Sequence, residues 1–259
     1  MKKVWITGAS SGIGEALAYA YATDHNHLIL SARNIKELER VKQACKGALQ
    51  VDIVPLDLSN HEEVFQIVEE TLSKISHVDI LINNAGISQR SLIRETSFEV
   101  DKNLIQTNLL GTIAITKAVL PSMLARKSGQ IVVVSSLMGK FGAPMRSAYA
   151  AAKHGLHGFF DTLRAEFYHE NIKVLMVCPG FVRTSVSINA LTGDGSKQNT
   201  MDDATEKGLE PSFVAKKIKL AAQKNKEEIY VGGREVVGVY LKRFFPRILS
   251  KIVRKAKVT

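Results

Sequence analysis

The sequence predicts an α/β protein in which a doubly wound parallel sheet of about seven strands lies between two layers of helices. Two observations support this prediction. Short apolar runs rich in β-branched residues alternate with helical patterns along most of the chain. Several of these runs, such as "HLILSA" at residues 27–32, are apolar on both faces, which is typical of parallel strands that helices cover on both sides.

The expected elements follow one another with short connections, so no linker divides the body of the chain. Strands are expected at residues 4–7, 27–32, 51–56, 78–82, 130–135, 173–177 and 228–231. Helices are expected at residues 15–23, 35–45, 62–74, 101–125, 147–168 and 212–224. The turn sequence "DLSN" predicts that Ser59 or Asn60 caps the third helix.

One irregular stretch interrupts this alternation at residues 181–211, directly after the sixth expected strand. Long loops in compact domains are more often functional than idle, and ligands of open parallel sheets bind at the carboxyl ends of the strands. We therefore expect a substrate loop within one domain of residues 1–233. A solvated loop without a function would have the same composition.

The composition is that of an ordinary globular protein, with 259 residues, 45% of them hydrophobic and 23% charged. The two cysteines, Cys45 and Cys178, exclude a disulfide framework and a CxxC zinc site. The histidines lack carboxylate or thiolate neighbours at metal-ligand spacing, so no metal site is expected. No continuous apolar run reaches about 18 residues and the N-terminal run is too short for a signal peptide, so we expect no spanning helix and a cytoplasmic location.

The net charge of +10 is concentrated at the C-terminus. Residues 234–259 contain eight basic side chains and one acidic side chain, whereas the preceding 233 residues contain 27 basic and 24 acidic ones. The body is therefore nearly neutral, and residues 234–259 are expected to form a basic amphipathic C-terminal extension.

Within this extension, Pro246 should break residues 236–255 into two short helices. One face is expected to be apolar, with Leu241, Phe244, Phe245, Ile248, Leu249, Ile252 and Val253. A basic amphipathic helix with aromatic residues suits peripheral contact with an anionic membrane. Packing of the apolar face on the body or on a second subunit is the alternative, and the two can coexist. No nucleic-acid partner is expected, because the charge lies in a short tail without a known binding module.

A glycine-rich loop, "GASSGIG", joins the first strand to the first helix. Glycines at Gly8, Gly12 and Gly14 allow a tight turn and bring backbone N–H groups close to a pyrophosphate, which the helix N-terminus attracts. Their GxxxGxG spacing differs from the usual GxGxxG dinucleotide motif. The loop predicts dinucleotide binding, with a small-residue helix start as the alternative.

Arg33 follows the second strand, where a carboxylate would bind the 2′-hydroxyl of an adenosine ribose. A guanidinium at this position suits a 2′-phosphate, which it can bind through paired hydrogen bonds. We therefore predict NADP(H) as the cofactor, although a solvated arginine at the start of a helix is the alternative.

Further motifs follow the loop in a fixed order and resemble the short-chain dehydrogenase/reductase family, in its single-domain subfamily, over residues 3–232. They are "NNAG" (83–86), Asn108, Ser136, "YAAAK" (149–153) and "PGFVRT" (179–184), together with the opening "TGASSGIG". The resemblance implies a three-layer α-β-α Rossmann fold and an oxidoreductase that interconverts a carbonyl and an alcohol by hydride transfer with a nicotinamide dinucleotide.

The residues themselves support this chemistry. Tyr149 and Lys153 are four positions apart on a helix and share a face. A nearby ammonium should lower the pKa of the phenol and make Tyr149 a general acid for reduction and a base for oxidation. Ser136 can donate a hydrogen bond to the substrate oxygen. A surface helix pair is the alternative for Tyr149 and Lys153 taken alone.

The resemblance implies the remaining roles. Lys153 also binds the nicotinamide ribose, Asn108 supports a water-linked proton relay to it, and Thr184 binds the carboxamide. The cofactor site further includes Ser10, Ser11, Ile13, Asp57, Leu58, Asn83, Ala85, Gly86, Tyr149, Pro179, Gly180 and Val182. Ser10 departs from the basic residue that NADP-preferring relatives often have in the glycine loop, which leaves Arg33 as the main determinant.

The region from "PGFVRTSVSINALTGDGS" (179–196) through "MDDATEKGLEP" (201–211) to the C-terminal extension resembles the dehydrogenase/reductase member 7B and 11β-hydroxysteroid dehydrogenase-like branch of the family. This implies an apolar lipid-, steroid- or retinoid-like substrate, a homodimer or homotetramer, and membrane association. Candidate pocket walls, for which ordinary core packing is the alternative, are Met138, Phe141, Met145, Phe181 and Val186. The alternative function is a non-catalytic nucleotide-sensing or membrane-surface scaffold protein on the same fold.

Overall fold

The computed structural model describes residues 1–255 of the chain. The strands are β1 (Lys3–Thr7), β2 (His27–Ser31), β3 (Gln50–Ile53), β4 (Ile80–Asn83), β5 (Gly129–Val134), β6 (Ile172–Pro179) and β7 (Glu228–Val231). The α-helices are α1 (Gly12–Ala22), α2 (Ile35–Ala44), α3 (His61–Ile75), α4 (Phe98–Ile105), α5 (Gly111–Ala125), α6 (Ser147–Glu166), α7 (Asp203–Glu206), α8 (Pro211–Gln223), α9 (Val237–Phe244) and α10 (Pro246–Val253). Short turns of 3₁₀-helix are η1 (Ile93–Glu95), η3 (Leu137–Gly139) and η4 (Arg234–Val236), and η2 (Gln106–Leu110) is a π-helix.

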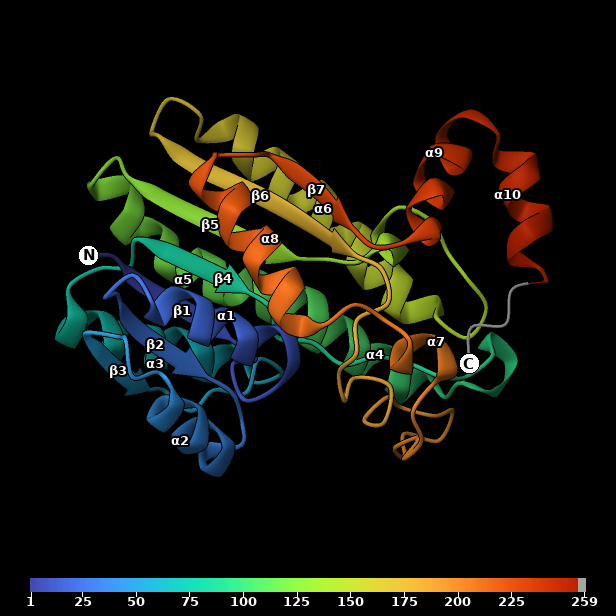
Figure 1. Ribbon diagram of the computed structural model, residues 1–259, viewed down its shortest axis with the longest axis horizontal. Helices are drawn as coiled ribbons and strands as arrows, with labels where there is room; N and C mark the ends of the chain where they lie inside the picture. The colour runs from blue at the N-terminus through green and yellow to red at the C-terminus, as the bar shows by residue number, and fades with distance from the viewer. Residues whose placement is uncertain (256–259) are drawn as a thin grey trace.

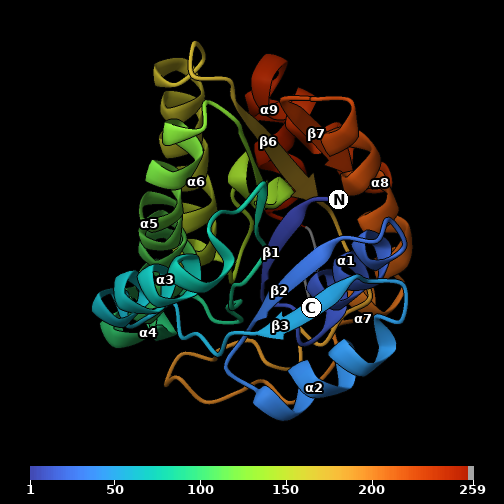
Figure 2. The same cartoon turned by 90° about the vertical axis from the view of Figure 1, so that its left-hand side faces the viewer.

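All seven strands pair in parallel in the order β3-β2-β1-β4-β5-β6-β7. Helices α1, α2 and α8 cover one face of this sheet, and α3, α5 and α6 cover the other (Figures 1 and 2). The predicted three-layer, doubly wound α/β fold is therefore confirmed.

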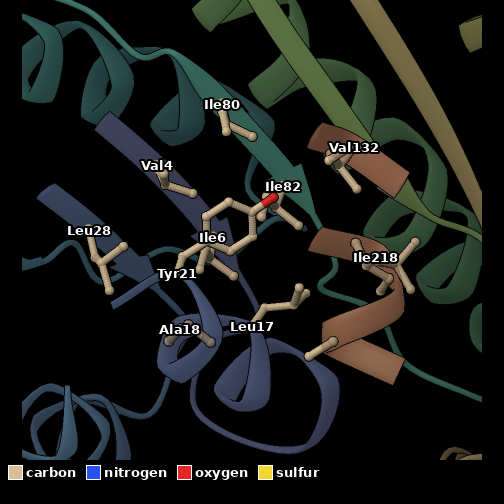
Figure 3. Close-up of a cluster of buried hydrophobic side chains, with 14 of the residues drawn as sticks. Val4, Ile6, Leu17, Ala18, Tyr21, Leu28, Ile80, Ile82, Val132 and Ile218 are labelled. Carbon is tan, nitrogen blue, oxygen red and sulfur yellow. The ribbon is translucent and has the colours of Figure 1, made fainter. Parts of the chain in front are cut away.

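The core forms because successive side chains of a strand point to opposite faces of the sheet. Val4 and Ile6 of β1 pack toward α1 and α8, beside Leu17 (Figure 3), whereas Trp5 points to the other layer, where Phe160 of α6 is buried. All five of these side chains are fully buried. This two-sided burial explains why the strand sequences are apolar on both faces.

The predicted helix at residues 101–125 begins earlier, at Phe98, and runs without interruption through α4, η2 and α5 to Ala125. By length and composition alone this helix could cross a membrane, which differs from the expectation that no such helix is present. Ile115 and Met123 of the same helix are fully buried in the core, so packing against the sheet accounts for its apolar character.

Helix α3 is capped by Asn60, one of the two residues that the sequence nominated. The Oδ1 atom of Asn60 accepts a hydrogen bond from the Glu63 N–H at 3.5 Å, and its Nδ2 donates to Glu63 Oε2 at 2.8 Å. Ser59 instead donates to Asp57 Oδ1 through its N–H and its hydroxyl.

The expected irregular stretch at residues 181–211 contains one short helix, α7.

The C-terminal helices α9 and α10 lie at the end of the molecule beyond the carboxyl ends of β6 and β7 (Figure 1). The predicted break at Pro246 is confirmed, because Phe245 is not helical. The apolar side chains of the extension divide between the body and the surface. Leu249 is buried against Phe141, whereas Phe244 is 68% exposed. Residues 256–259, with Lys257, lie outside the described part of the chain.

Candidate active site

A cavity of about 800 Å³ opens at the carboxyl ends of the strands. Its walls come from the segments that follow the first six strands, from α6 and from residues 181–211. The strand order reverses between β1 and β4, and the crevice at such a switch point is where open parallel sheets hold their ligands.

The glycine loop forms one wall of this cavity through Gly8, Ser10, Ser11, Gly12 and Ile13. Gly8 and Gly12 have φ angles of 65° and 57°, which other residues adopt only with strain. A Cβ atom on Gly8 would lie 2.8 Å from the Ala85 backbone. The Ser11 side chain makes no capping hydrogen bond, so it does not occupy the first N–H groups of α1. This close backbone and open helix N-terminus fit a pyrophosphate.

Arg33 and Asp57 line the cavity beside this loop, at what we call the nucleotide end, together with Leu58. Arg33 is exposed, so its guanidinium is available to a ligand. Although burial raises the pKa of Asp57, hydrogen bonds from Ser59 and the positive charge of Arg33 hold that pKa below its ordinary value. A cation and a carboxylate therefore lie near each other where an adenosine would be bound.

Ser136, Tyr149 and Lys153 line the other end of the cavity, which we call the catalytic end. Tyr149 and Lys153 lie on α6, with Lys153 Nζ 5.7 Å from the centre of the Tyr149 ring. Ser136 precedes η3 and forms a side-chain hydrogen bond with Tyr149. Lys153 Nζ donates to the Val134 carbonyl at 2.9 Å, which fixes the ammonium beneath the ring. The structure thus brings together three groups that can bind and protonate a substrate oxygen.

The ionisation of these groups differs from the prediction. Burial raises the pKa of Tyr149, and the hydrogen bond with Ser136 and the positive charges of Arg146 and Arg90 oppose that rise. Burial also lowers the pKa of Lys153 to about 8. The expectation that the pKa of Tyr149 is lowered is therefore wrong. Desolvation outweighs the neighbouring positive charges, so the net shift of this pKa is upward.

Asn108 lies behind the cavity wall, fully buried within the π-helix η2. Its Oδ1 accepts from the Ile87 N–H at 2.8 Å and its Nδ2 donates to the Ile87 carbonyl at 2.9 Å. A Cβ atom on Gly86 would lie 2.8 Å from Asn108 Oδ1 and 3.7 Å from Lys153 Nζ. Gly86 is therefore the point at which Asn108 and Lys153 approach each other.

Most of the other residues nominated from the sequence lie in the cavity wall. These are Ala85, Gly86, Pro179, Gly180, Val182 and Thr184. Gly14 and Asn83 lie outside the wall among the described residues. A Cβ atom on Gly14 would be 2.1 Å from the Gly8 carbonyl oxygen, so Gly14 allows helix and loop to pack. Asn83 is buried and donates to Thr116 Oγ1.

The neighbouring Asn84 was not predicted from the sequence as a residue of the site. It lines the cavity, and its Nδ2 donates to the carbonyls of Thr7 and Gly8 at 3.0 and 3.2 Å, which ties the segment after β4 to the glycine loop. The second asparagine of "NNAG" was the feature of the sequence that could have identified it.

Among the candidate pocket walls, Met138, Phe181 and Val186 line the cavity. Phe141 and Met145 do not line it. Phe141 instead packs under the C-terminal helices with Leu249.

Two buried arginines of the cavity wall were also missed. Arg90 is 7% exposed and bonds Asp202 through Nε at 2.8 Å and through Nη2. Arg146 is 5% exposed, and its Nη2 lies 3.7 Å from the same Asp202 carboxylate. Both guanidinium groups donate to the Gln89 carbonyl at 2.8 Å. This cluster joins the segment after β4, the start of α6 and residues 181–211 beside Tyr149.

Comparisons with known proteins agree with this geometry. A family model described as short chain dehydrogenase matches residues 2–194. The chain is 42% identical to "Dehydrogenase/reductase SDR family protein 7-like" of Drosophila melanogaster, over 99% of this chain and 81% of that protein. It is 39% identical to "Dehydrogenase/reductase SDR family member 7B" of Bos taurus, over 96% of this chain and 79% of that protein.

Solved structures give the same result for the fold. A short-chain dehydrogenase from Streptomyces avermitilis superposes with a TM-score of 0.85 at 28% identity, over 99% of this chain and 98% of that one. An alcohol dehydrogenase from the archaeon Thermococcus sibiricus, complexed with 5-hydroxy-NADP, gives a TM-score of 0.77 at 28% identity, over 90% of this chain and 97% of that one.

Proposed function

The chain belongs to the short-chain dehydrogenase/reductase family, within its member 7 branch, and from this premise we propose that it is an NADP(H)-dependent carbonyl reductase. The proposed reaction interconverts a carbonyl and a primary or secondary alcohol. The observation that carries the proposal is the convergence of Ser136, Tyr149 and Lys153 at one end of a cavity whose other end is formed by the glycine loop at the N-terminus of α1.

Each catalytic residue has a role that its position supports. When bound, the reduced nicotinamide supplies a hydride to the carbonyl carbon. Ser136 donates a hydrogen bond to the carbonyl oxygen and orients it. Tyr149 gives that oxygen a proton in reduction and takes it back in oxidation. The raised pKa of Tyr149 keeps the phenol protonated at neutral pH, which is the form that reduction requires.

Lys153 and Asn108 support these two groups. Lys153, held by the Val134 carbonyl, is proposed to bind the ribose hydroxyls next to Tyr149. Asn108 fixes the backbone of Ile87 and, beside Gly86, is proposed to position a proton relay toward Lys153. Thr184 lies against Gly12, from where it is proposed to hydrogen-bond the carboxamide.

We propose NADP(H) in preference to NAD(H) because an exposed guanidinium, Arg33, follows β2 and lines the nucleotide end. Arg40 also lines this end, but its Nη1 and Nη2 bond Glu15 at 2.8 and 2.9 Å, which leaves Arg33 as the better donor to a 2′-phosphate. Asp57 and Leu58 are proposed to contact the adenine.

The substrate is proposed to have an apolar, lipid-like body. Met138, Phe181 and Val186 line the catalytic end and come from η3 and from residues 181–211. The body of the chain, residues 1–233, is proposed to act as one catalytic domain with residues 181–211 as its substrate loop. A homodimer or homotetramer built on the long helices α5 and α6 is the proposed assembly.

The C-terminal helices are proposed to place the enzyme at an anionic membrane, while the body is cytoplasmic. Exposed apolar side chains at Phe244, Phe245, Ile248 and Ile252 lie among the basic residues Lys242, Arg243, Arg247, Lys251 and Arg254. Replacing Phe244 and Phe245 by serine should abolish flotation with anionic liposomes, whereas Phe213→Ser on α8, also exposed, should have no effect. Equal flotation of both variants would contradict the proposal.

The proposed activity is tested by following NADPH oxidation with a panel of ketones, aldehydes and lipid carbonyls. Turnover of any panel member at a rate above that of the uncatalysed reaction supports the proposal. Tight NADPH binding without turnover across the panel would instead favour the second candidate, a nucleotide-sensing or membrane-surface scaffold protein.

A further inference from the structure

A buried ionisable side chain beside the catalytic end has no role in the proposed mechanism. His157 is 7% exposed and lies on α6, where it continues the stripe of Tyr149 and Lys153 at intervals of four residues. An apolar side chain would fill a packed interior with a smaller desolvation penalty than an imidazole. The imidazole at this position therefore has a reason other than packing.

The Nε2 atom of His157 lies 3.2 Å from Ser135 Oγ, and this hydroxyl in turn donates to the Lys153 carbonyl at 3.3 Å. Ser135 is buried and follows β5, directly before Ser136. These contacts form a chain from His157 through Ser135 to the backbone of Lys153. The chain joins the end of β5, which carries Ser136, to the helix that carries Tyr149 and Lys153.

The groups of this chain are packed closely against η3. A Cβ atom on Gly139 would lie 2.7 Å from Ser135 Oγ and 2.9 Å from the Lys153 carbonyl oxygen. The same atom would lie 3.0 Å from His157 Cδ2. Glycine at this position therefore lets η3, which begins directly after Ser136, pack against the chain. A shift of the imidazole would reach both catalytic segments, because closely packed interiors transmit strain.

The hydrogen bonds assign the proton of the imidazole. The Ser135 hydroxyl has one proton and gives it to the Lys153 carbonyl, so His157 Nε2 must donate to Ser135 Oγ. The Nδ1 atom then carries a lone pair and lies 3.7 Å from Glu228 Oε2, which is also an acceptor. Two acceptors cannot form a hydrogen bond. This explains why Nδ1 is one of the buried side-chain atoms within residues 1–255 that have no hydrogen-bond partner.

The imidazole is neutral at neutral pH. Burial lowers its pKa to about 4, and the positive charge of Lys140 acts in the same direction. Its other titratable neighbours are Glu228 of β7 and, on α6, Asp161 and His154. The Glu228 carboxylate accepts from Lys140 Nζ at 2.7 Å and from the Tyr230 hydroxyl. Other donors therefore bind this carboxylate, and the Nε2 proton of His157 is directed to Ser135.

We propose that His157 is a positioning residue, which acts through Ser135 to hold the two catalytic segments in register. This inference rests on the proposed function. Ser136 and Tyr149 must both reach one substrate oxygen, and small displacements of catalytic groups lower reaction rates strongly. The unpaired Nδ1 atom lowers stability, which a side chain that served packing alone would avoid.

The kinetic test compares two amides at this position, in the full-length enzyme with NADPH and a carbonyl compound that the wild type reduces. The amide of His157→Gln reaches the position of Nε2 and can donate to Ser135 Oγ, whereas the shorter His157→Asn reaches only the position of Nδ1. We expect kcat to fall about tenfold or more in His157→Asn and to stay within about threefold of the wild type in His157→Gln. His169→Asn, at an exposed position, is the control and should leave kcat unchanged.

A second variant tests the transmission through Ser135. Ser135→Ala should lower kcat by a factor similar to that of His157→Asn, and the two losses should not multiply in the double variant. Rates are referred to the concentration of NADPH-binding sites, so partial unfolding does not imitate the effect. Wild-type kcat in Ser135→Ala would overturn the proposal, whether or not the histidine variants fold. Losses that multiply in a folded double variant would overturn it as well.

A spectroscopic measurement separates this inference from the proposed function. Nitrogen NMR of the histidine rings shows which ring nitrogen carries the proton and requires no turnover, and the His157 signal is identified by its loss in His157→Gln. A proton on Nε2 at neutral pH, with a signal that shifts in Ser135→Ala, supports the hydrogen-bonded chain even if no carbonyl compound is reduced. A proton on Nδ1, directed to Glu228, would overturn the inference even if ketones are reduced.

Discussion

The nucleotide end and the catalytic end of the cavity use charge in different ways. Arg33 at the nucleotide end is exposed, and its field is screened by water. At the catalytic end, Arg146 and Lys153 are buried, and burial lowers the pKa of both groups. A substitution that changes charge should therefore have a larger effect on activity and stability at the catalytic end, because desolvation has already shifted the pKa values of the groups there.

The largest expected effect is at Tyr149. Tyr149→Phe should lower kcat by about 10²- to 10⁴-fold, because it removes the proton donor, while NADPH affinity changes little. Steady-state kinetics and NADPH fluorescence titration measure the two quantities. Tyr168→Phe, whose side chain is 66% exposed, is the matched control and should leave both unchanged. Turnover retained in Tyr149→Phe would show that this end of the cavity is not the reaction centre.

The second prediction concerns His157, which lies beneath the catalytic end. Its Nε2 is 3.2 Å from Ser135 Oγ, and burial lowers its pKa to about 4. The folded protein therefore binds this proton less readily than the unfolded chain does. Stability from this residue is complete above about pH 6.5 and is lost as the pH falls toward 4, by at most about 3 kcal/mol.

Denaturant unfolding at a series of pH values measures this loss. His157→Gln should flatten the stability profile between pH 6.5 and 4, whereas His169→Gln, at an exposed position, should leave it as in the wild type. A profile that is equally steep in His157→Gln would show that burial of this imidazole does not govern acid stability.

At the nucleotide end, Arg33→Asp should reduce the preference for NADPH over NADH by about tenfold to a hundredfold, because a carboxylate repels a 2′-phosphate. Ratios of kcat/KM for the two cofactors measure the change, and added salt should weaken the wild-type preference. Lys36→Asp, an equal charge change at a neighbouring exposed position outside the cavity wall, is the control. An unchanged ratio in Arg33→Asp would assign cofactor selection to other residues.

The smallest effect is expected at the helix cap. Asn60→Ala should lower the free energy of unfolding by about 1 kcal/mol without changing turnover, because it removes the hydrogen bond to the Glu63 N–H. Asn60→Asp should retain the cap and most of the stability. If alanine and aspartate behave alike in denaturant unfolding, the hydrogen bond contributes little.

The local sequence pattern predicted most of the helices and strands correctly. The seven strands, the Asn60 cap and the break at Pro246 follow from side-chain periodicity and from residues with strong backbone preferences. The positions of Ser136, Tyr149 and Lys153 after β5 and on α6 could also be anticipated, because motifs fix them relative to these elements. The π-helix at Asn108 could not, since the same sequence is compatible with a regular helix.

The cluster of Arg90, Arg146 and Asp202 had no signal in the sequence. Arg90 and Asp202 are 112 residues apart in the chain, and only the docking of residues 181–211 brings them together. In the same way, the C-terminal pattern predicted amphipathic helices but not that Leu249 would be buried while Phe244 stays exposed.

The sequence by itself determined the fold class, the order of the elements, the glycine loop and the motifs, since each depends on residues close together in the chain. Tertiary structure alone decided which charges share a cavity, how deeply they are buried and so in which direction their pKa values move. The physical reason is that desolvation depends on every segment packed around a group, and no local pattern encodes the whole set.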